Sequence, residues 1–247
     1  MGDAIDSTLH LPRILCLHGG GTNARIFRAQ CRNLSNLLQP HFRLCFAEAP
    51  FPSHAGPDVL SVYKDWGPFR CWFEWRPDEP ERNVEATFLA IQASVDSAMR
   101  DDDQKGGTGE WVAVLGFSQG AKLAGSLLLL QQLQAEGLRG RISRPATNYR
   151  FAVLLAGRAP LVNFAAGSAV EPSCRHLYLP TIHVHGLTDP GLELHRQLLE
   201  QSCQKGSTRL VQWDGNHRLP IKTGDTMAVV QAVLEMAAET GVLKRSS

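Results

Sequence analysis

The chain has 247 residues, of which 43% are hydrophobic and 20% are charged. This composition is typical of a globular protein that packs its own core, and it excludes a disordered chain. The 25 basic and 24 acidic residues give a formal net charge of +1, with no long run of basic residues, so we expect no nucleic-acid partner. The length fits a single domain that spans residues 1–247.

The start of the chain and its apolar runs indicate neither export nor membrane insertion. The first residues include Asp3 and Asp6 but no basic cluster or apolar stretch, so no secretory signal is predicted. The most apolar run, 123–130, is much shorter than the roughly 20 residues that cross a bilayer. The six cysteines contain no Cys-x-x-Cys pair, which favours reduced thiols over disulfides or a zinc site. We therefore expect a cytoplasmic protein that makes no contact with membranes.

Short apolar runs alternate with longer amphipathic runs, a pattern typical of βα units around a parallel sheet. Strands are expected near residues 14–17, 43–49, 111–115, 151–155, 181–185 and 209–213. Helices are expected near residues 26–38, 81–99, 119–135, 190–204 and 225–239. The acidic, glycine-rich stretch 101–107 and the basic stretch 139–150 are expected to be solvated loops. The pattern predicts the α/β class, with helices on both faces of a mostly parallel central sheet.

The regular pattern disappears between residues 51 and 80, where aromatic residues gather. Six of them lie between positions 63 and 75, namely Tyr63, Trp66, Phe69, Trp72, Phe73 and Trp75. A long irregular insertion is uncommon unless it forms a lid or a binding loop. We interpret it as the wall of an apolar acyl pocket, with Trp66, Phe69, Trp72 and Phe73 as the substrate-binding residues. Ordinary core packing of these rings is the alternative.

The segment Gly116-Phe117-Ser118-Gln119-Gly120 fits the pattern Gly-x-Ser-x-Gly between an expected strand and an expected helix. In a nucleophile elbow the serine occupies a strained turn at this place, and the flanking glycines remove side chains that would clash. The alternative is a tight strand-to-helix connection with an inert serine. We predict that Ser118 is a nucleophile.

A serine hydroxyl needs a histidine base held by a carboxylate. Asp189 and His217 each follow an expected strand, so both should lie at the carboxyl edge of the sheet, where open α/β sheets place their sites. The order Ser118, Asp189, His217 is that of α/β-hydrolases. Asp214 is a competing acid, but its place on the loop of His217 favours a turn role.

Two further features of the sequence are candidates for parts of a site. His183 and His185 share one face of a strand, which would suit a metal pair, but no third ligand has a recognisable spacing and core histidines are favoured. His18-Gly19-Gly20-Gly21 follows the first strand, where α/β-hydrolases place an oxyanion-binding loop. The expected donors are the backbone N–H groups of Gly20 or Gly21 and of Gln119.

Five segments together resemble the FSH family of serine hydrolases, over a region from Pro12 to about Glu239. They are Leu17-His18-Gly19-Gly20-Gly21-Thr22-Asn23, Gly67-Pro68-Phe69-Arg70-Cys71-Trp72-Phe73, Gly116-Phe117-Ser118-Gln119-Gly120-Ala121, His185-Gly186-Leu187-Thr188-Asp189 and Gly215-Asn216-His217-Arg218-Leu219-Pro220. Fungal members of this family include thioesterases that work beside polyketide synthases. The resemblance implies an α/β-hydrolase fold, with the aromatic insertion near 51–80 resembling a lid.

The resemblance also implies a function: Ser118, Asp189 and His217 would hydrolyse esters or thioesters without a metal or an organic cofactor. For a fungal member it implies release of a polyketide acyl chain from the carrier domain of a synthase. Arg139, Arg141, Arg144 and Arg150 would then be candidates for docking an acidic carrier domain, or simply a solvated loop. The alternatives are a general carboxylesterase or acyl-protein thioesterase, and a non-catalytic binding module on the same fold.

Overall fold

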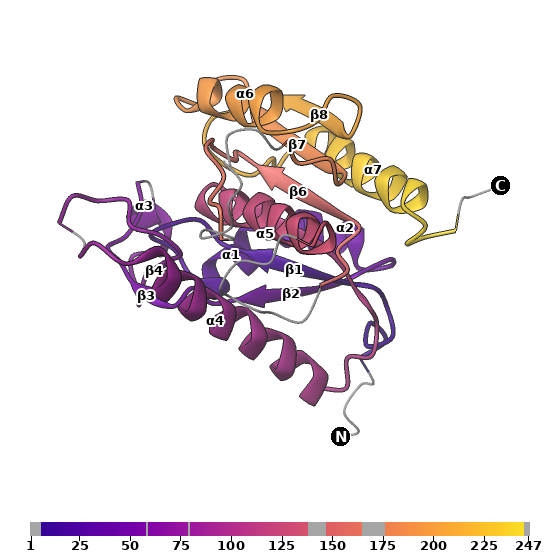
Figure 1. Cartoon of the computed structure of the whole chain (residues 1–247), viewed down its shortest axis with the longest axis horizontal. Coiled ribbons are helices and arrows are strands. Elements are labelled where there is room, and N and C mark those ends of the chain that lie inside the picture. Colours follow the sequence, from indigo (N-terminus) through magenta and orange to yellow (C-terminus); the bar gives the residue numbers. More distant parts are fainter. Residues whose placement is uncertain (1–5, 58, 79, 138–146, 165–175, 245–247) are drawn as a thin grey trace.

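A six-stranded sheet forms the centre of the molecule, in the order β2-β1-β5-β6-β7-β8 (Figure 1). The structure, a computed structural model, describes residues 6–57, 59–78, 80–137, 147–164 and 176–244. The strands are β1 (Arg13–Leu17), β2 (Arg43–Ala47), β5 (Trp111–Phe117), β6 (Phe151–Leu155), β7 (Thr181–Gly186) and β8 (Thr208–Trp213). All neighbouring pairs are parallel. The carboxyl ends of all six strands therefore meet at one edge of the sheet.

Two sets of helices cover the two faces of the sheet, as the sequence predicts. They are α1 (Ala24–Gln30), α2 (Arg32–Leu38), α4 (Val84–Gln104), α5 (Gln119–Ala135), α6 (Leu192–Gln201) and α7 (Thr223–Glu239). The single helix expected over 26–38 is instead two helices that meet at Cys31. Asn23 begins the first of them, because its side-chain oxygen accepts a hydrogen bond from the Ile26 N–H at 2.8 Å.

Alternation along the strands divides the apolar side chains between two cores. In β1, Leu15 and Leu17 pack in one core with residues of α4, α5 and α6. Ile14 and Cys16 pack in the other core with residues of α1, α2 and α7. Successive side chains of a strand point to opposite faces, so a strand that is covered on both faces must be apolar throughout. This is why the central strands appear in the sequence as continuous hydrophobic runs.

The stretch 51–80 contains short regular elements that the sequence pattern did not reveal. β3 (Phe51–Pro52) pairs antiparallel with β4 (Arg70–Cys71), and the short helix α3 (Val59–Tyr63) lies between them in the chain. Figure 1 shows these three elements together at one end of the molecule. Two backbone hydrogen bonds hold β4 to the loop after β1: Gly21 N–H donates to the Arg70 carbonyl and Arg70 N–H to the Thr22 carbonyl.

The prediction of a solvated connector over 101–107 is wrong for its first half, because α4 continues to Gln104. Asp102 is buried, and its carboxylate oxygens lie 2.8 Å from the Arg43 Nε and 3.3 Å from an Arg13 nitrogen. These arginines begin β2 and β1. The acidic residue therefore joins the end of α4 to the start of two strands, a pairing that acidic composition alone cannot indicate.

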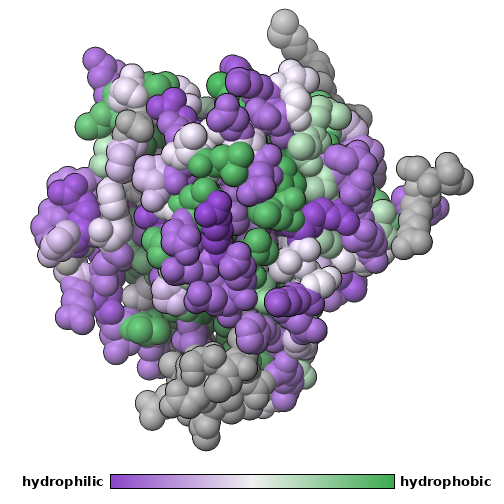
Figure 2. Space-filling view, turned by 90° about the horizontal axis from the view of Figure 1, so that it is seen from above, coloured by the Kyte–Doolittle hydropathy of each residue, from purple (hydrophilic) through white to green (hydrophobic). Residues whose placement is uncertain are grey.

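Among the described residues, none of the helices is long and apolar enough to span a membrane. Figure 2 shows one face of the molecule, on which hydrophobic residues form separate patches among hydrophilic ones.

We expect Asp102→Asn to lower the free energy of unfolding by about 3 kcal/mol, because it removes the one buried carboxylate among the partners of Arg13 and Arg43 and leaves them only exposed carboxylates. Urea denaturation of both variants measures this. The matched control is Asp103→Asn, which removes the neighbouring partner of Arg13, a side chain that is 55% exposed; its cost should stay below about 1 kcal/mol. Equal losses in the two variants would contradict the buried role of Asp102.

Candidate active site

Ser118 occupies a strained turn between β5 and α5. Its φ of 53° and ψ of −113° are unusual for a residue with a side chain. The turn is fixed by a hydrogen bond from Ser118 N–H to the Leu155 carbonyl of β6, at 2.8 Å. A Cβ at Gly116 would overlap the Gly120 carbonyl, and a Cβ at Gly120 would overlap the Leu17 carbonyl. The turn thus requires glycine at both flanking positions, as the pattern predicts.

The structure brings Ser118, His217 and Asp189 into one hydrogen-bonded line. His217 Nε2 lies 2.9 Å from Ser118 Oγ, and His217 Nδ1 lies 2.6 Å from Asp189 Oδ2. The Asp189 side chain is fully buried, and its Oδ1 accepts a hydrogen bond from Gly191 N–H at 2.7 Å. With the carboxylate holding the Nδ1 proton, Nε2 is free to accept a proton from the serine hydroxyl.

The competing acid lies elsewhere. Asp214 is exposed, whereas the buried Asp189 occupies Nδ1 of the histidine. Asp189 follows β7 and His217 follows β8, the neighbouring strand, which pairs with β7 in parallel. The two loops emerge at the same edge of the sheet, and for this reason strand ends were a sufficient guide to the pair.

In the glycine-rich loop, the backbone N–H of Gly20 is available as an oxyanion donor and that of Gly21 is not. Gly21 has a φ of 69°, and a Cβ there would overlap the backbone of Gly56. Its N–H already donates to the Arg70 carbonyl at 2.9 Å, so the expectation that Gly21 supplies an oxyanion amide is wrong. Gly20 lines the cavity above Ser118, and its N–H has no acceptor within the described part of the chain. Gln119 begins α5, where helix amides lack an acceptor within the helix.

His18 shapes this loop, a role that the sequence analysis did not assign. It is fully buried; its Nδ1 lies 2.8 Å from the Gly19 carbonyl, and its Nε2 accepts a hydrogen bond from Ala49 N–H at 3.1 Å. The same Nε2 also lies 3.1 Å from Glu48 Oε1. Thr22 Oγ1 donates to the same Gly19 carbonyl at 2.7 Å. The His-Gly-Gly-Gly segment is thereby held by its own first side chain.

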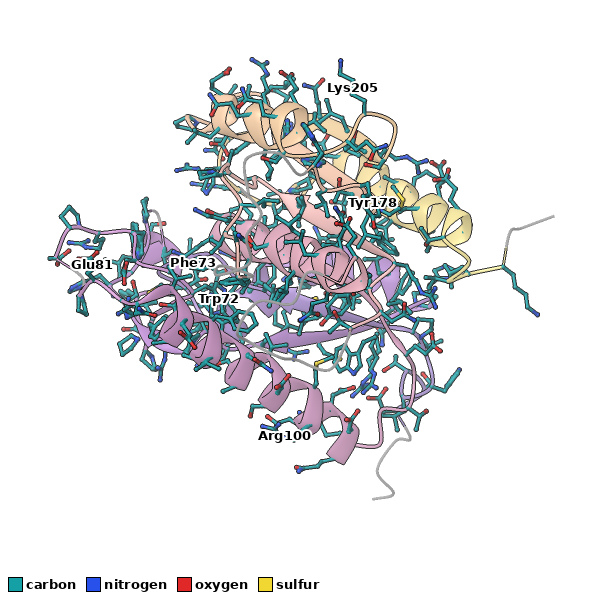
Figure 3. The ribbon with its side chains drawn as sticks, in the orientation of Figure 1. Trp72, Phe73, Glu81, Arg100, Tyr178 and Lys205 are labelled. Atoms are coloured by element: carbon teal, nitrogen blue, oxygen red, sulfur yellow. The ribbon has the colours of Figure 1, made fainter. Side chains whose placement is uncertain are left out.

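The Gln119 side chain connects the serine turn to the aromatic segment. Its Oε1 accepts a hydrogen bond from Trp72 N–H at 2.7 Å, and its Nε2 donates to the Phe73 carbonyl at 2.8 Å. Trp72 is fully buried, and its indole N–H donates to the His18 carbonyl at 2.8 Å. Figure 3 shows Trp72 and Phe73 between α4 and α5. The residue after the nucleophile therefore fixes the loop that lies opposite it.

A cavity of about 1300 Å³ opens over Ser118 and His217. Of the four aromatic residues predicted to bind substrate, Phe73 alone lines it; Tyr63 and Trp75 line it as well. The assignments of the other three are wrong. Trp72 lies in the core, the Trp66 ring lies under the Arg25 guanidinium at 4.1 Å, and Phe69 lies against Gly67. An aromatic cluster without a period gives no indication of which rings face inward.

His183 and His185 are buried core residues, as favoured over a metal pair. The His183 Nε2 lies 3.0 Å from Thr181 Oγ1. Burial lowers the pKa of His183 to about 3 and that of His185 to about 4. A third buried histidine, His195 of α6, also has its pKa lowered by burial, to about 4, and it lies beside Asp189. All three rings are neutral at pH 7.

Comparison with known proteins decides the family. The family model described as "Serine hydrolase (FSH1)" matches residues 8–229. The chain belongs to this family. It is 53% identical to "Esterase pigG" of Monascus ruber, covering 97% of this chain and 96% of that protein. It is 55% identical to "Probable esterase azaC" of Aspergillus niger, covering 96% and 90%.

Solved structures show the same fold at low sequence identity. A carboxylesterase from Mesorhizobium loti aligns with a TM-score of 0.54 at 20% identity, covering 90% of this chain and 88% of that one. Acyl-protein thioesterase 2 of Zea mays aligns with a TM-score of 0.53 at 19% identity, covering 94% and 96%. The serine hydrolase thus has the predicted α/β-hydrolase fold, and it is an enzyme that acts on esters.

We expect Gln119→Ala to lower the kcat/KM of this serine hydrolase about tenfold or more, because the aromatic segment loses its two bonds to the serine turn while every backbone amide remains. Gln119→Glu is the comparison variant: it keeps the acceptor for Trp72 N–H but places a carboxylate oxygen against the Phe73 carbonyl, so its loss should be at least as large. Ester hydrolysis and urea denaturation, measured on both variants, separate activity from stability. Wild-type kcat/KM in Gln119→Ala would contradict the coupling.

Proposed function

We propose that this serine hydrolase is a thioesterase that releases a polyketide acyl chain from the carrier domain of a synthase. The observation that carries the hydrolytic part is the line from Ser118 through His217 to Asp189, with separations of 2.9 and 2.6 Å. The resemblance to fungal thioesterases supports the thioester, and the enzyme's fungal relatives are named esterases. A general carboxylesterase is the alternative.

The chemistry follows from the positions of these three side chains. Ser118 Oγ attacks the acyl carbonyl carbon while His217 Nε2 takes the hydroxyl proton, and His217 then returns that proton to the departing thiol or alcohol. Water repeats the sequence on the acyl-enzyme and releases the acid. Asp189 holds the Nδ1 proton and stabilises the imidazolium that forms.

The oxyanion that forms on the carbonyl oxygen needs donors above Ser118. The Gly20 and Gln119 amides are the candidates, since both residues line the cavity. Each such donor typically contributes about 3 kcal/mol to the stabilisation of the transition state. The Gly20 amide lies on a loop held by hydrogen bonds and the Gln119 amide lies at a helix N-terminus, so neither donor needs to reorganise during the reaction.

Lys122 supports an oxygen-rich acyl chain over a plain fatty one. It lies one helical turn after Ser118 on α5 and lines the same cavity. Its ammonium lies 5.9 Å from the centre of the Phe73 ring, and within the described residues it has no carboxylate or other acceptor. Burial lowers its pKa, which reflects the cost of the desolvated charge. A carbonyl or enolate oxygen along a polyketide chain would provide the missing partner.

Labelling with a fluorophosphonate probe tests the nucleophile. We expect the wild type to be labelled at Ser118 and Ser118→Ala to be neither labelled nor active, because no other hydroxyl lies beside His217 Nε2 in the described residues. A folded wild type that resists the probe would favour the binding-module alternative.

The thioester preference has its own test. Kinetics with acyl-N-acetylcysteamine thioesters and with oxygen esters of the same acyl group give two values of kcat/KM. We expect the thioesters to be preferred. A preference for the oxygen esters would leave a serine esterase and refute the thioesterase.

The basic residues Arg139, Arg141 and Arg144, candidates for docking a carrier domain, lie outside the described residues.

We expect Lys122→Met to lower kcat/KM about tenfold for a β-ketoacyl thioester, while a saturated acyl thioester of equal length is hydrolysed nearly as before. A hydrogen bond to a charged group contributes about 1.5–3 kcal/mol, and the expected tenfold loss corresponds to the lower end of that range. Lys105→Met, an exposed change at the far end of α4, is the control. Equal losses of kcat/KM for the two substrates would mean that Lys122 does not bind an oxygen of the acyl chain.

A further inference from the structure

Buried histidine rings extend from β7 to the serine site. The ring centres of His183 and His185 are 6.0 Å apart, those of His185 and His195 are 5.5 Å apart, and those of His195 and His217 are 6.1 Å apart. His195 is fully buried on α6, and among the described residues neither of its ring nitrogens has a hydrogen-bond partner. The proposed mechanism uses only His217 of this series.

An unpartnered imidazole beside a buried carboxylate needs a physical explanation. A buried polar atom without a partner costs about 1–3 kcal/mol, and His195 contains two of them. Its Nε2 lies 3.8 Å from Asp189 Oδ2, which is too long for a hydrogen bond. It therefore points toward the carboxylate that also holds His217.

Three ligand atoms converge at this place. One atom each from Asp189, His195 and His217 lie within 4.8 Å of one another. Two neutral imidazoles and one carboxylate, with an open fourth position, are a ligand set typical of zinc. Of these three residues, His217 lines the cavity and its side chain is 31% exposed, whereas the side chains of Asp189 and His195 are fully buried, so an ion would enter from the cavity past His217.

We propose that Asp189, His195 and His217 form an inhibitory binding site for a divalent transition-metal ion, with zinc as the best fit. The inhibition rests on the proposed function, whereas the binding does not. Zinc bonds of about 2.0–2.2 Å in a tetrahedron place neighbouring ligand atoms roughly 3.3 Å apart. The 2.6 Å separation between His217 and Asp189 would widen, and the 3.8 Å separation between His195 and Asp189 would shorten.

The chemistry of inhibition is a change of tautomer. Zinc bonds to the His217 Nδ1 lone pair, so the single proton of the neutral ring must sit on Nε2. No proton is gained or lost: the proton leaves Nδ1 and one appears on Nε2, while the carboxylate stays ionised and water leaves the metal. Nε2 then faces Ser118 Oγ as a donor and cannot take its proton. The bound ion thereby removes the base without touching the serine.

Binding is tested first on Ser118→Ala, which keeps all three ligands and needs no activity. Calorimetric titration with zinc, and the visible absorption of cobalt in its place, should show one ion per chain. In the double variant Ser118→Ala with His195→Leu the affinity should fall about tenfold or more. His54→Leu in the Ser118→Ala background removes an exposed histidine beside Asp78 and should leave the affinity unchanged.

Activity provides the second readout, in a variant series with Ser118 intact. Zinc should inhibit ester hydrolysis by the wild type, a chelator should restore it, and His195→Leu should need about tenfold more zinc. Because neither nitrogen of His195 has a partner, we expect His195→Leu to hydrolyse the ester normally without metal. Should the leucine variant not fold, His195→Gln replaces it.

The outcomes separate the two proposals. Absence of zinc binding by Ser118→Ala up to about 1 mM, or binding and inhibition that do not depend on His195, would overturn the metal site, and a buried water would then be the occupant. Zinc binding by a protein that shows no hydrolysis in any assay would overturn the proposed function and leave the site standing.

Discussion

The positive φ of Ser118 is the constraint on which the rest of the site depends. A turn this tight lifts the hydroxyl above the end of β5. It exists because Gly116 lets β5 approach the start of α5, and Gly120 lets α5 approach β1, without a Cβ between the backbones. The strain, of order 1–3 kcal/mol, is sustained by the bond from Ser118 N–H to β6 and by the close packing of α5 on the sheet. The serine thus stays above the sheet edge where His217 and Asp189 arrive.

Much of this arrangement could be predicted because it depends on strand ends. β5 and β7 are buried along nearly their whole length, and the edge strand β8 is only partly buried. A residue that follows any of these parallel strands lies at the carboxyl edge of the sheet whatever the rest of the fold does. Ser118, Asp189 and His217 are all of this kind. Asp214 also follows a strand, and it was its place on the same loop as His217 that favoured Asp189 as the acid.

The errors occur where the structure depends on partners far away in the sequence. Asp102 has the local signature of a solvated loop, and its two arginines lie 59 and 89 positions away. Gly21 and Gly20 are indistinguishable in composition, yet the Arg70 carbonyl of the antiparallel pair occupies one amide and leaves the other. Among the aromatic residues, two hydrogen bonds of the Gln119 side chain to the backbone fix Trp72 and Phe73, with one ring inward and one toward the cavity. Long-range pairing of this kind leaves no periodic signal.

The hydrolytic function and the metal site both depend on the negative charge of the buried Asp189 carboxylate. Gly191 N–H and His217 together neutralise part of that charge, but His195 sits too far away to share it as a hydrogen-bond donor. A neutral His195 ring at this distance has a free lone pair and carries no positive charge. One cation placed between Asp189, His195 and His217 would therefore satisfy all three ligand atoms. During catalysis the imidazolium of His217 supplies that positive charge transiently; a metal ion would supply it permanently. The protonated His217 ring and a bound metal ion would therefore occupy the same place beside Asp189. An enzyme molecule that holds the ion cannot turn over substrate, and one that turns over substrate cannot hold the ion.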